Sequence, residues 1–148
     1  MMRLHPDWRE FVELLNSHEV EYIIVGAYAR ALHGVPRSTG DIDLFVRPTA
    51  ENAARMQRAI AAFGFGSLGI TAEDFQISGR VIQLGVEPYR IDLITSISGL
   101  SFDEAWSDRV RGELDGLPVA FLSLRALKKN KIAAGRPKDL ADLADLPE

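Results

Sequence analysis

The stretch "STGDIDLFV", residues 38–46, decides both the fold and the candidate site of this chain. Its apolar residues alternate with Asp41 and Asp43, a pattern that predicts a β-strand. Side chains at i and i+2 of a strand project from the same face, so the two carboxylates lie side by side, roughly 7 Å apart at Cα. Because like charges this close raise each other's pKa, the pair calls for a positive group next to it.

A third acidic residue falls in another predicted strand, as Asp92 of "YRIDLIT", residues 89–95. Aspartate is disfavoured in strands, and if the two strands are neighbours the three carboxylates converge. The chain has no cysteine and only three histidines, so oxygen ligands favour Mg²⁺ or Mn²⁺ over zinc. Such ions serve phosphoryl and nucleotidyl transfer. The alternative interpretation is that Asp41 and Asp43 form the solvated face of an edge strand.

Composition narrows the class of protein. The 148 residues suit one domain, residues 1–148, and the contents of 47% hydrophobic and 26% charged residues are ordinary for a soluble globular protein. A net charge of −4 shows that the chain is not basic overall, so a nucleic acid would have to be bound by a local basic patch or through metal ions. The absence of cysteine, of an apolar leader and of long apolar runs predicts a cytoplasmic protein without a membrane partner.

Periodicity, capping residues and turn signals predict an alternation of helices and strands. Helices are expected over residues 5–20, 27–34, 50–63, 101–106, 124–135 and 137–146, and strands over 21–26, 41–46, 80–86, 89–95 and in a hairpin within 111–122. The glycine-rich segment 64–79 is expected to be a loop with one helical turn. This order predicts an α+β (mixed α/β) domain, with the C-terminal helices, residues 123–146, packing on the core.

The junction before the first aspartate carries candidate ligand-binding residues. Gly26 ends one predicted strand and opens a helix, where backbone can approach a ligand and N–H groups can hold a phosphate. Arg37 lies four residues before Asp41 and could reach a phosphate or pair with an aspartate. Strand–glycine–helix junctions also occur in many α/β folds without a ligand, and that alternative stays open.

Basic residues near the C-terminus are candidate contacts to the nucleotide. Lys131 is predicted to point into a cleft toward a triphosphate, with a solvated basic helix face as the alternative. Arg136 and Lys138 in "GRPKD" are predicted phosphate or RNA contacts, with a simple helix–helix corner as the alternative. Asp139 and Asp142 are expected at exposed helix positions.

Two longer stretches resemble a known family. The segment "GAYARALHGVPRSTGDIDLFV", residues 26–46, followed by the distal Asp92, is similar to the nucleotidyltransferase superfamily of the polymerase-β type. Within it, the chain resembles the minimal domains related to AbiEii-type toxins of toxin–antitoxin systems, and bacterial nucleotidyltransferases of unknown target. The tail "LSLRALKKNKIAAGRPKDLADLADL", residues 122–146, is similar to the ending of the same group. The likeness runs from about residue 8 to residue 146.

The resemblance implies a fold, a reaction and residue roles. It implies a mixed β-sheet flanked by helices, and transfer of a nucleoside monophosphate from an NTP to a hydroxyl of RNA or tRNA, a protein or a small molecule. Asp41 and Asp43 would bind two Mg²⁺ or Mn²⁺ ions, and Asp92 would bind the catalytic ion and help to deprotonate the acceptor. Gly26 and the backbone at Ala27 would cradle the triphosphate. A toxin of this group would have a cognate antitoxin.

One position departs from the superfamily pattern. The residue after the glycine is usually serine or glycine, whereas here it is Ala27, so backbone contacts alone must hold the phosphate. This leaves a second hypothesis open, in which the chain is a catalytically inactive nucleotide- or partner-binding module on the same fold.

Overall fold

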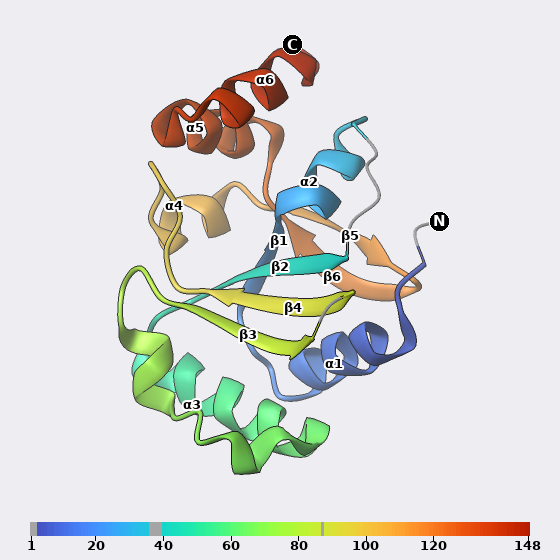
Figure 1. Ribbon diagram of the computed structural model, residues 1–148, viewed down its shortest axis with the longest axis vertical. Coiled ribbons are helices and arrows are strands. Elements are labelled where there is room, and N and C mark those ends of the chain that lie inside the picture. Colours follow the sequence, from blue (N-terminus) through green and yellow to red (C-terminus); the bar gives the residue numbers. More distant parts are fainter. Residues whose placement is uncertain (1–2, 36–39, 87) are drawn as a thin grey trace.

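The structure is a computed structural model that describes residues 3–35, 40–86 and 88–148 (Figure 1). Its described residues form a six-stranded mixed sheet with helices on both faces, which confirms the expected α+β (mixed α/β) class. The strands are β1 (Tyr22–Val25), β2 (Asp41–Val46), β3 (Val81–Val86), β4 (Tyr89–Ile94), β5 (Val110–Leu114) and β6 (Leu117–Phe121). The helices are α1 (Pro6–Ser17), α2 (Gly26–Leu32), α3 (Ala50–Ile60), α4 (Phe102–Ser107), α5 (Leu124–Ala134) and α6 (Pro137–Asp145).

The order of elements matches the order expected from the sequence, with more regular structure in the glycine-rich segment. Residues 61–76 contain a π-helical turn (Ala61–Phe65) and two 3₁₀ turns (Gly66–Leu68 and Ala72–Gln76). Phe75 of the last turn is fully buried in the core cluster that also contains α3. Burial of this one aromatic side chain therefore anchors a segment whose sequence has little periodicity.

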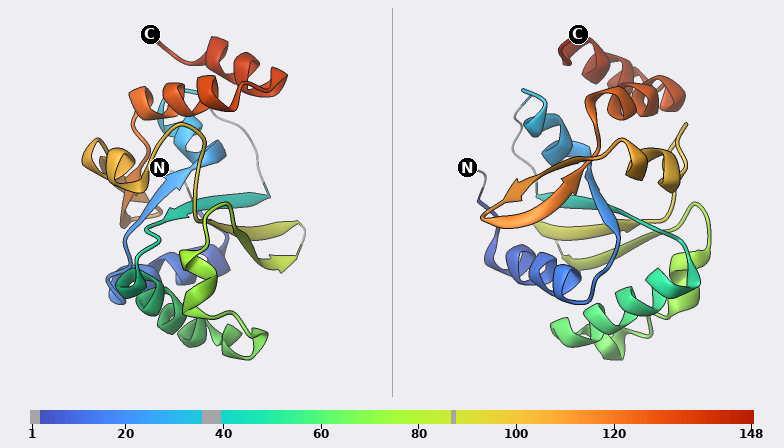
Figure 2. Two further views of the ribbon diagram at one scale, coloured as in Figure 1. Left: turned by 90° about the vertical axis from the view of Figure 1, so that its left-hand side faces the viewer. Right: turned by 180° about the vertical axis from the view of Figure 1, so that it is seen from behind.

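Two hydrophobic clusters cover the two faces of the sheet. Alternation along β1 sends Ile24 to the cluster beneath α1 and α3, and sends Ile23 and Val25 to the cluster beneath α2, α4 and α5. Figure 2 shows these two groups of helices on opposite sides of the sheet. Because both faces are covered, the central strands carry apolar residues on both sides, and the acidic residues of β2 and β4 stand out as exceptions.

Strand directions bring the ends of distant segments together. The sheet order is β3-β4-β2-β1-β6-β5, with β1 antiparallel to β2 and parallel to β6, and with β2 parallel to β4. The carboxyl ends of β1 and β6 therefore lie at the same edge as the amino end of β2. As a result α2, which follows β1, begins beside β2, and residues of α5 and α6, which come after β6, line the same cavity as Asp41 and Asp43. No helix in the described ranges is long and apolar enough to cross a membrane.

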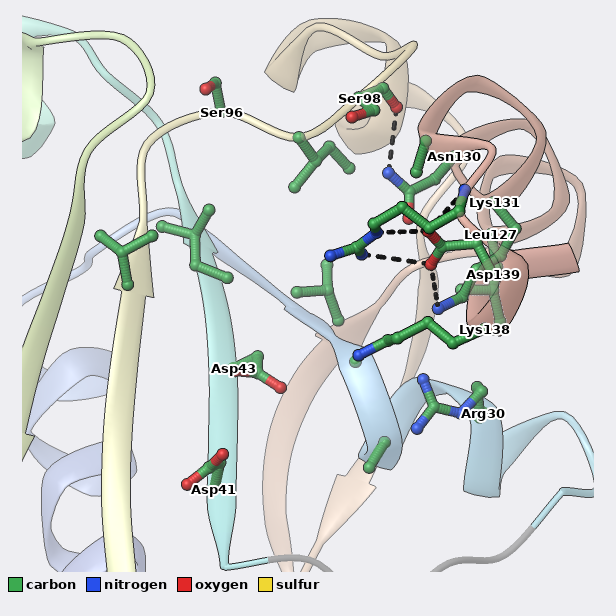
Figure 3. Close-up of a pocket in the computed structure, with 18 residues that line it drawn as sticks. Arg30, Asp41, Asp43, Ser96, Ser98, Leu127, Asn130, Lys131, Lys138 and Asp139 are labelled. Carbon is green, nitrogen blue, oxygen red and sulfur yellow. Dashed lines mark hydrogen bonds and ion pairs between the residues drawn. The ribbon is translucent and has the colours of Figure 1, made fainter. Parts of the chain in front are cut away.

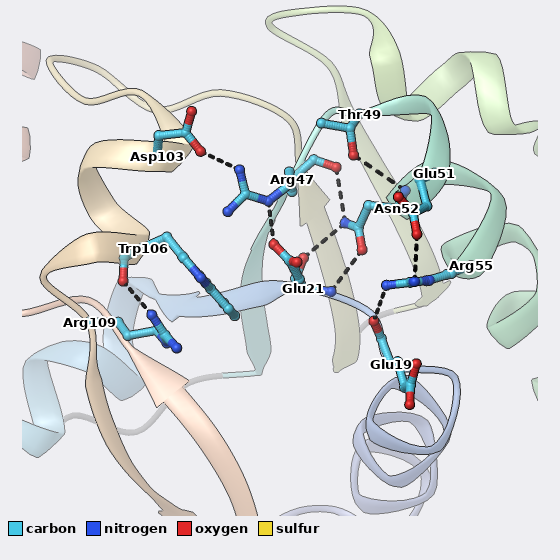
Figure 4. A network of polar contacts seen from close by, with 10 residues as sticks. All are labelled: Glu19, Glu21, Arg47, Thr49, Glu51, Asn52, Arg55, Asp103, Trp106 and Arg109. Carbon is cyan, nitrogen blue, oxygen red and sulfur yellow. Dashed lines mark hydrogen bonds and ion pairs between the residues drawn. The ribbon is translucent and has the colours of Figure 1, made fainter.

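The opposite end of β1 and β2 is fixed by a polar network (Figure 4). The buried Asn52 side chain, at the start of α3, accepts from the Glu21 N–H at 2.7 Å and donates to the backbone oxygens of Glu21 and Arg47 at 3.0 Å. Arg47 also forms ion pairs with Glu21 and with Asp103 of α4. These contacts tie the start of β1 to the end of β2, at the end of the two strands that lies away from Asp41.

Candidate active site

The pairing of β2 with β4 brings the three predicted aspartates to one place. Asp43 lies opposite Asp92, and Asp41 lies opposite Arg90, in a parallel register in which neighbouring strands are about 4.8 Å apart. Asp92 lies close enough to Asp43 for its negative charge to raise the pKa of the Asp43 carboxyl group. The expectation that two acidic strands are neighbours is thus met, and Asp41 and Asp43 do not lie on an edge strand.

Arg90 supplies the positive group that this acidic cluster requires. Its Nε donates to Asp92 Oδ1 at 2.9 Å, and its Nη2 donates to Asp41 Oδ2 at 3.0 Å. One guanidinium thus bridges two of the three carboxylates. Sequence reasoning missed Arg90. Its i, i+2 spacing from Asp92, which puts both side chains on one face of the strand, is the signal that could have found it.

The surroundings of Asp43 disfavour its charged form. Its pKa is raised to about 7, mainly because burial penalises the charged form and then because Asp92 and Asp41 repel its charge. Arg30 lowers the pKa of Asp43 only in part. Arg90 alone therefore does not neutralise the cluster, and an added cation would be stabilised beside Asp43.

The Asp43 side chain leaves no room for a side chain at position 26, where the chain has a glycine. Val25 pairs with Asp43 in the β1–β2 register, so the next residue passes directly over the Asp43 side chain. Gly26 has φ +67, and a Cβ added there would overlap Asp43 Oδ2 and lie 3.0 Å from Cγ. A side chain is excluded by both conformation and space, which explains glycine at the start of α2. The next residue, Ala27, is buried and also lines the cavity described below.

The donor set fits a hard divalent cation, although the described side chains form no ready-made cage. The carboxylates of Asp41, Asp43 and Asp92 offer only oxygen atoms, which suits Mg²⁺ or Mn²⁺. Burial, followed by the charges of Asp92 and Asp41, raises the pKa of Asp43, and a bound cation would oppose that shift. No group of three or more His, Cys, Asp or Glu side chains in the described part of the chain is arranged to hold a metal ion. In this arrangement Arg90 forms ion pairs with Asp41 and with Asp92.

A cavity of about 820 Å³ opens beside the aspartates (Figure 3). Asp41, Asp43 and the Gly26–Ala27 backbone form one side, and residues of α5 and α6 form the other. Figure 3 shows the ammonium group of Lys138 directed toward Asp43. Lys131 and Arg136 line the cavity as well, so the structure brings these candidate contacts together with the aspartates. Arg37, the remaining candidate, lies outside the described residues.

The charges between α5 and α6 are more buried than expected. Lys131 is 6% exposed, and its Nζ donates to Asp139 at 3.3 Å and to Asp142 at 3.1 Å. Arg136 Nε donates to Asp139 at 2.6 Å, and this bond, followed by the contact with Lys131, lowers the pKa of Asp139 to about 2. The expectation that Asp139 and Asp142 are exposed is wrong, because α6 turns its acidic face inward to meet Lys131. The half-exposed Leu140 lies on the outer face instead.

Arg30 of α2 is a second residue that the sequence analysis missed. Its side chain is buried and lines the cavity four residues after Gly26. The signal was a single arginine within the otherwise small and apolar helix sequence "GAYARAL". A buried arginine there is costly unless a partner meets its charge.

Comparison with known proteins shows the family to which the chain belongs. The family model described as "Nucleotidyltransferase of unknown function (DUF6036)" matches residues 3–146, so the chain belongs to that family. No curated protein matches the chain. The resemblance to nucleotidyltransferases is thus confirmed, whereas these comparisons do not show the AbiEii-type subgroup.

Two solved structures share the fold. A candidate nucleotidyltransferase from Thermotoga maritima is similar over 97% of this chain and 93% of its own, with 18% identity and a TM-score of 0.64. ANT(2″)-Ia, solved in complex with adenylyl-2″-tobramycin, is similar over 93% of this chain and 83% of its own, with 17% identity and a TM-score of 0.55. At these identities the likeness concerns the fold alone.

Proposed function

We propose that the chain transfers a nucleoside monophosphate from an NTP to a hydroxyl acceptor, in a reaction that depends on Mg²⁺ or Mn²⁺. The observation that carries the proposal is the meeting of Asp41, Asp43 and Asp92 on neighbouring strands, beside a cavity whose other side carries Lys138. Oxygen ligands at one side and a lysine at the other suit a metal–triphosphate substrate. Membership of a nucleotidyltransferase family supports this class of reaction.

The roles follow from the chemistry of the transfer. The acceptor oxygen forms a bond to the α-phosphorus, the bond from that phosphorus to its bridging oxygen breaks, and pyrophosphate leaves. Asp41, Asp43 and Asp92 would hold the divalent ions, which supply Lewis-acid stabilisation of the charged oxygens. Asp92 takes the acceptor proton, the Gly26–Ala27 backbone cradles the triphosphate, and the remaining contacts come from the cationic residues that line the cavity and from Arg37.

The proposed reaction allows three classes of acceptor. RNA or tRNA, a protein side chain and a small molecule all offer the required hydroxyl. The basic residues of α5 and α6 favour an RNA or protein target, as does the resemblance to AbiEii-type toxins, which would imply a cognate antitoxin. We also propose a cytoplasmic location and a single domain over residues 1–148. Ala126, Leu127 and Leu146, from the segment after residue 122, share a buried cluster with β1, which supports the single domain.

Thermal melting tests the proposal directly. Each NTP is added with and without Mg²⁺ or Mn²⁺ to wild type and to the Asp41→Ala/Asp43→Ala double variant. A ligand that binds only the folded state raises the melting temperature, so we expect a metal-dependent NTP shift that the double variant lacks. Transfer of labelled NTP onto total RNA and protein then identifies the acceptor class. Absence of a shift with every NTP in wild type would refute the proposal.

Two observations favour the alternative of a catalytically inactive module on the same fold. Arg90 takes oxygens of Asp41 and Asp92 that metal ions would use, and Ala27 offers no hydroxyl to a phosphate. Under this hypothesis NTP or a partner binds without turnover and without need of a metal. Nucleotide shifts that persist in EDTA, together with no labelled product, would select it.

A further inference from the structure

Strand β5 forms one edge of the sheet, and its outer side is open. The sheet order places β6 on one side of β5 and no strand from the described part of the chain on the other. Unpaired backbone groups at such an edge can pair with a strand of another chain, and natural edges commonly block this with bulges or prolines. β5 has neither, because its five residues contain no proline and pair with β6 in one unbroken register.

The turn between β5 and β6 decides which backbone groups of β5 point outward. Both residues of the turn, Asp115–Gly116, have positive φ (50 and 81), as the tightest hairpin turn requires. Leu114 and Leu117 are therefore the hydrogen-bonded pair beside the turn, and the two kinds of pair alternate from there along the strands. It follows that the N–H and C=O groups of Arg111 and Glu113 point away from β6, toward the open edge.

Arg111 and Glu113 carry opposite charges on either side of Gly112. Their side chains share one face of β5, because residues two apart in a strand project to the same side. Both side chains are exposed, and neither forms an ion pair with another residue in the described ranges. Val110, the apolar residue that begins the strand, is 37% exposed. The sequence Val-Arg-Gly-Glu-Leu is thus complementary in charge to a second copy of itself that runs in the opposite direction.

We propose that two copies of this chain associate through β5, as antiparallel strands related by a twofold axis at Gly112. In this register Arg111 of each copy lies opposite Glu113 of the other, so the two residues exchange both backbone hydrogen bonds and form a cross-strand ion pair, twice in each dimer. Val110 of each copy lies opposite Leu114 of the other, which covers part of the exposed valine. The absence of a side chain at Gly112 lets the two strands approach closely at the axis.

The other edge strand, β3, lacks these features. It carries no charged residue over Val81–Val86, and Gly85 has φ +83, which departs from extended geometry. Val81 also lines the cavity beside the aspartates. β5, in contrast, lies three strand positions from β2, roughly 14 Å away at the usual strand spacing, and its residues do not line that cavity. Dimer formation through β5 is therefore independent of the proposed function.

Sedimentation equilibrium of the full chain tests this dimer. Because each copy contributes one five-residue strand, the interface is small, and we expect wild type to dimerise with a Kd of roughly 50 µM, within a measured range of about 5 to 500 µM. Arg111→Glu and Glu113→Arg each make both cross-strand pairs repulsive, so either variant alone should dimerise about 10-fold more weakly, or less still. Arg58→Glu, a charge reversal at an exposed position of α3, should dimerise as wild type does.

Mixing the two single variants tests the register itself. In a mixed dimer the two acidic side chains of one copy face the two arginines of the other, so Arg111→Glu and Glu113→Arg should associate with each other better than either does alone. The double variant Arg111→Glu/Glu113→Arg again has opposite charges across the strands and should dimerise about as tightly as wild type. Melting temperatures close to that of wild type verify that each variant folds.

Three results would overturn the proposal. Wild type that stays monomeric throughout the measured range excludes the dimer. A dimer that neither single variant weakens has its interface elsewhere on the chain. A mixture of the two single variants that associates no better than each variant alone excludes the pairing of Arg111 with Glu113.

Discussion

Gly26→Ala should displace the Asp43 carboxylate and so disturb the candidate metal site, although no charged residue is replaced. The new Cβ would overlap Asp43 Oδ2 and lie 3.0 Å from Cγ and 3.2 Å from Cβ of the same residue. Asp43 cannot retreat easily, because its backbone is paired with both β1 and β4. The carboxylate must therefore rotate, or β1 must separate from β2.

Two separate costs follow from the structure. Alanine at the left-handed φ of Gly26 costs about 1–2 kcal/mol, and for a chain of this size each kcal/mol lowers the melting temperature by about 2–4 °C. The overlap with Asp43 adds a second cost that acts on the site. A misplacement of about 1 Å in a reacting group can reduce turnover by about 100-fold.

Gly69→Ala is the matched control, because Gly69 has a similar φ of +75 and nothing within 4 Å of an added Cβ. Melting temperatures and Mn²⁺ titrations of both variants separate backbone strain from overlap. We expect both to lose stability, Gly26→Ala more than Gly69→Ala, and only Gly26→Ala to bind Mn²⁺ more weakly. Equal losses of stability with unchanged Mn²⁺ affinity in both variants would refute the reasoning.

Three further predictions concern the charged groups. Arg90→Gln removes the positive charge that bridges Asp41 and Asp92, so its melting temperature in EDTA falls and Mn²⁺ restores more of it than in wild type; equal Mn²⁺ shifts would contradict this. Because the pKa of Asp43 is raised to about 7 from an ordinary value near 4, its contribution destabilises the metal-free fold as pH rises between those values, by at most about 1.4 kcal/mol per pH unit. In EDTA, Asp43→Asn should therefore gain stability over wild type from pH 5 to 7 and keep a constant advantage above pH 7, as urea unfolding would measure; an advantage that does not vary with pH would count against the assignment. Lys131→Met removes the ammonium group that bonds to two buried carboxylates of α6 and should unfold at lower urea than Lys128→Met, whose side chain is only partly buried; similar midpoints would show that the buried pairs contribute little.

Local patterns in the sequence predicted much of the fold. Capping boxes such as the one at Ser101, the Asp115–Gly116 turn of the β5–β6 hairpin and the alternation in β2 all depend on residues a few positions apart. Such signals act through short-range hydrogen bonds and sterics, so they can be recognised without knowing the neighbours in space. The weakly periodic residues 64–79 were predicted less well, because their order depends on burying Phe75 beneath a distant helix.

The sequence by itself determined that Asp41 and Asp43 share one face of a strand, since the period of two is built into the backbone. Only the tertiary structure decided that β4 lies beside β2, which sets Asp92 against Asp43 and brings Arg90 between two carboxylates. The burial of Asp142 and the incomplete bonding of Arg30 likewise depend on how α6 packs over α5 and α2. These features arise from contacts between segments more than 40 residues apart or from helix packing, and the pattern of side chains within one element cannot specify them.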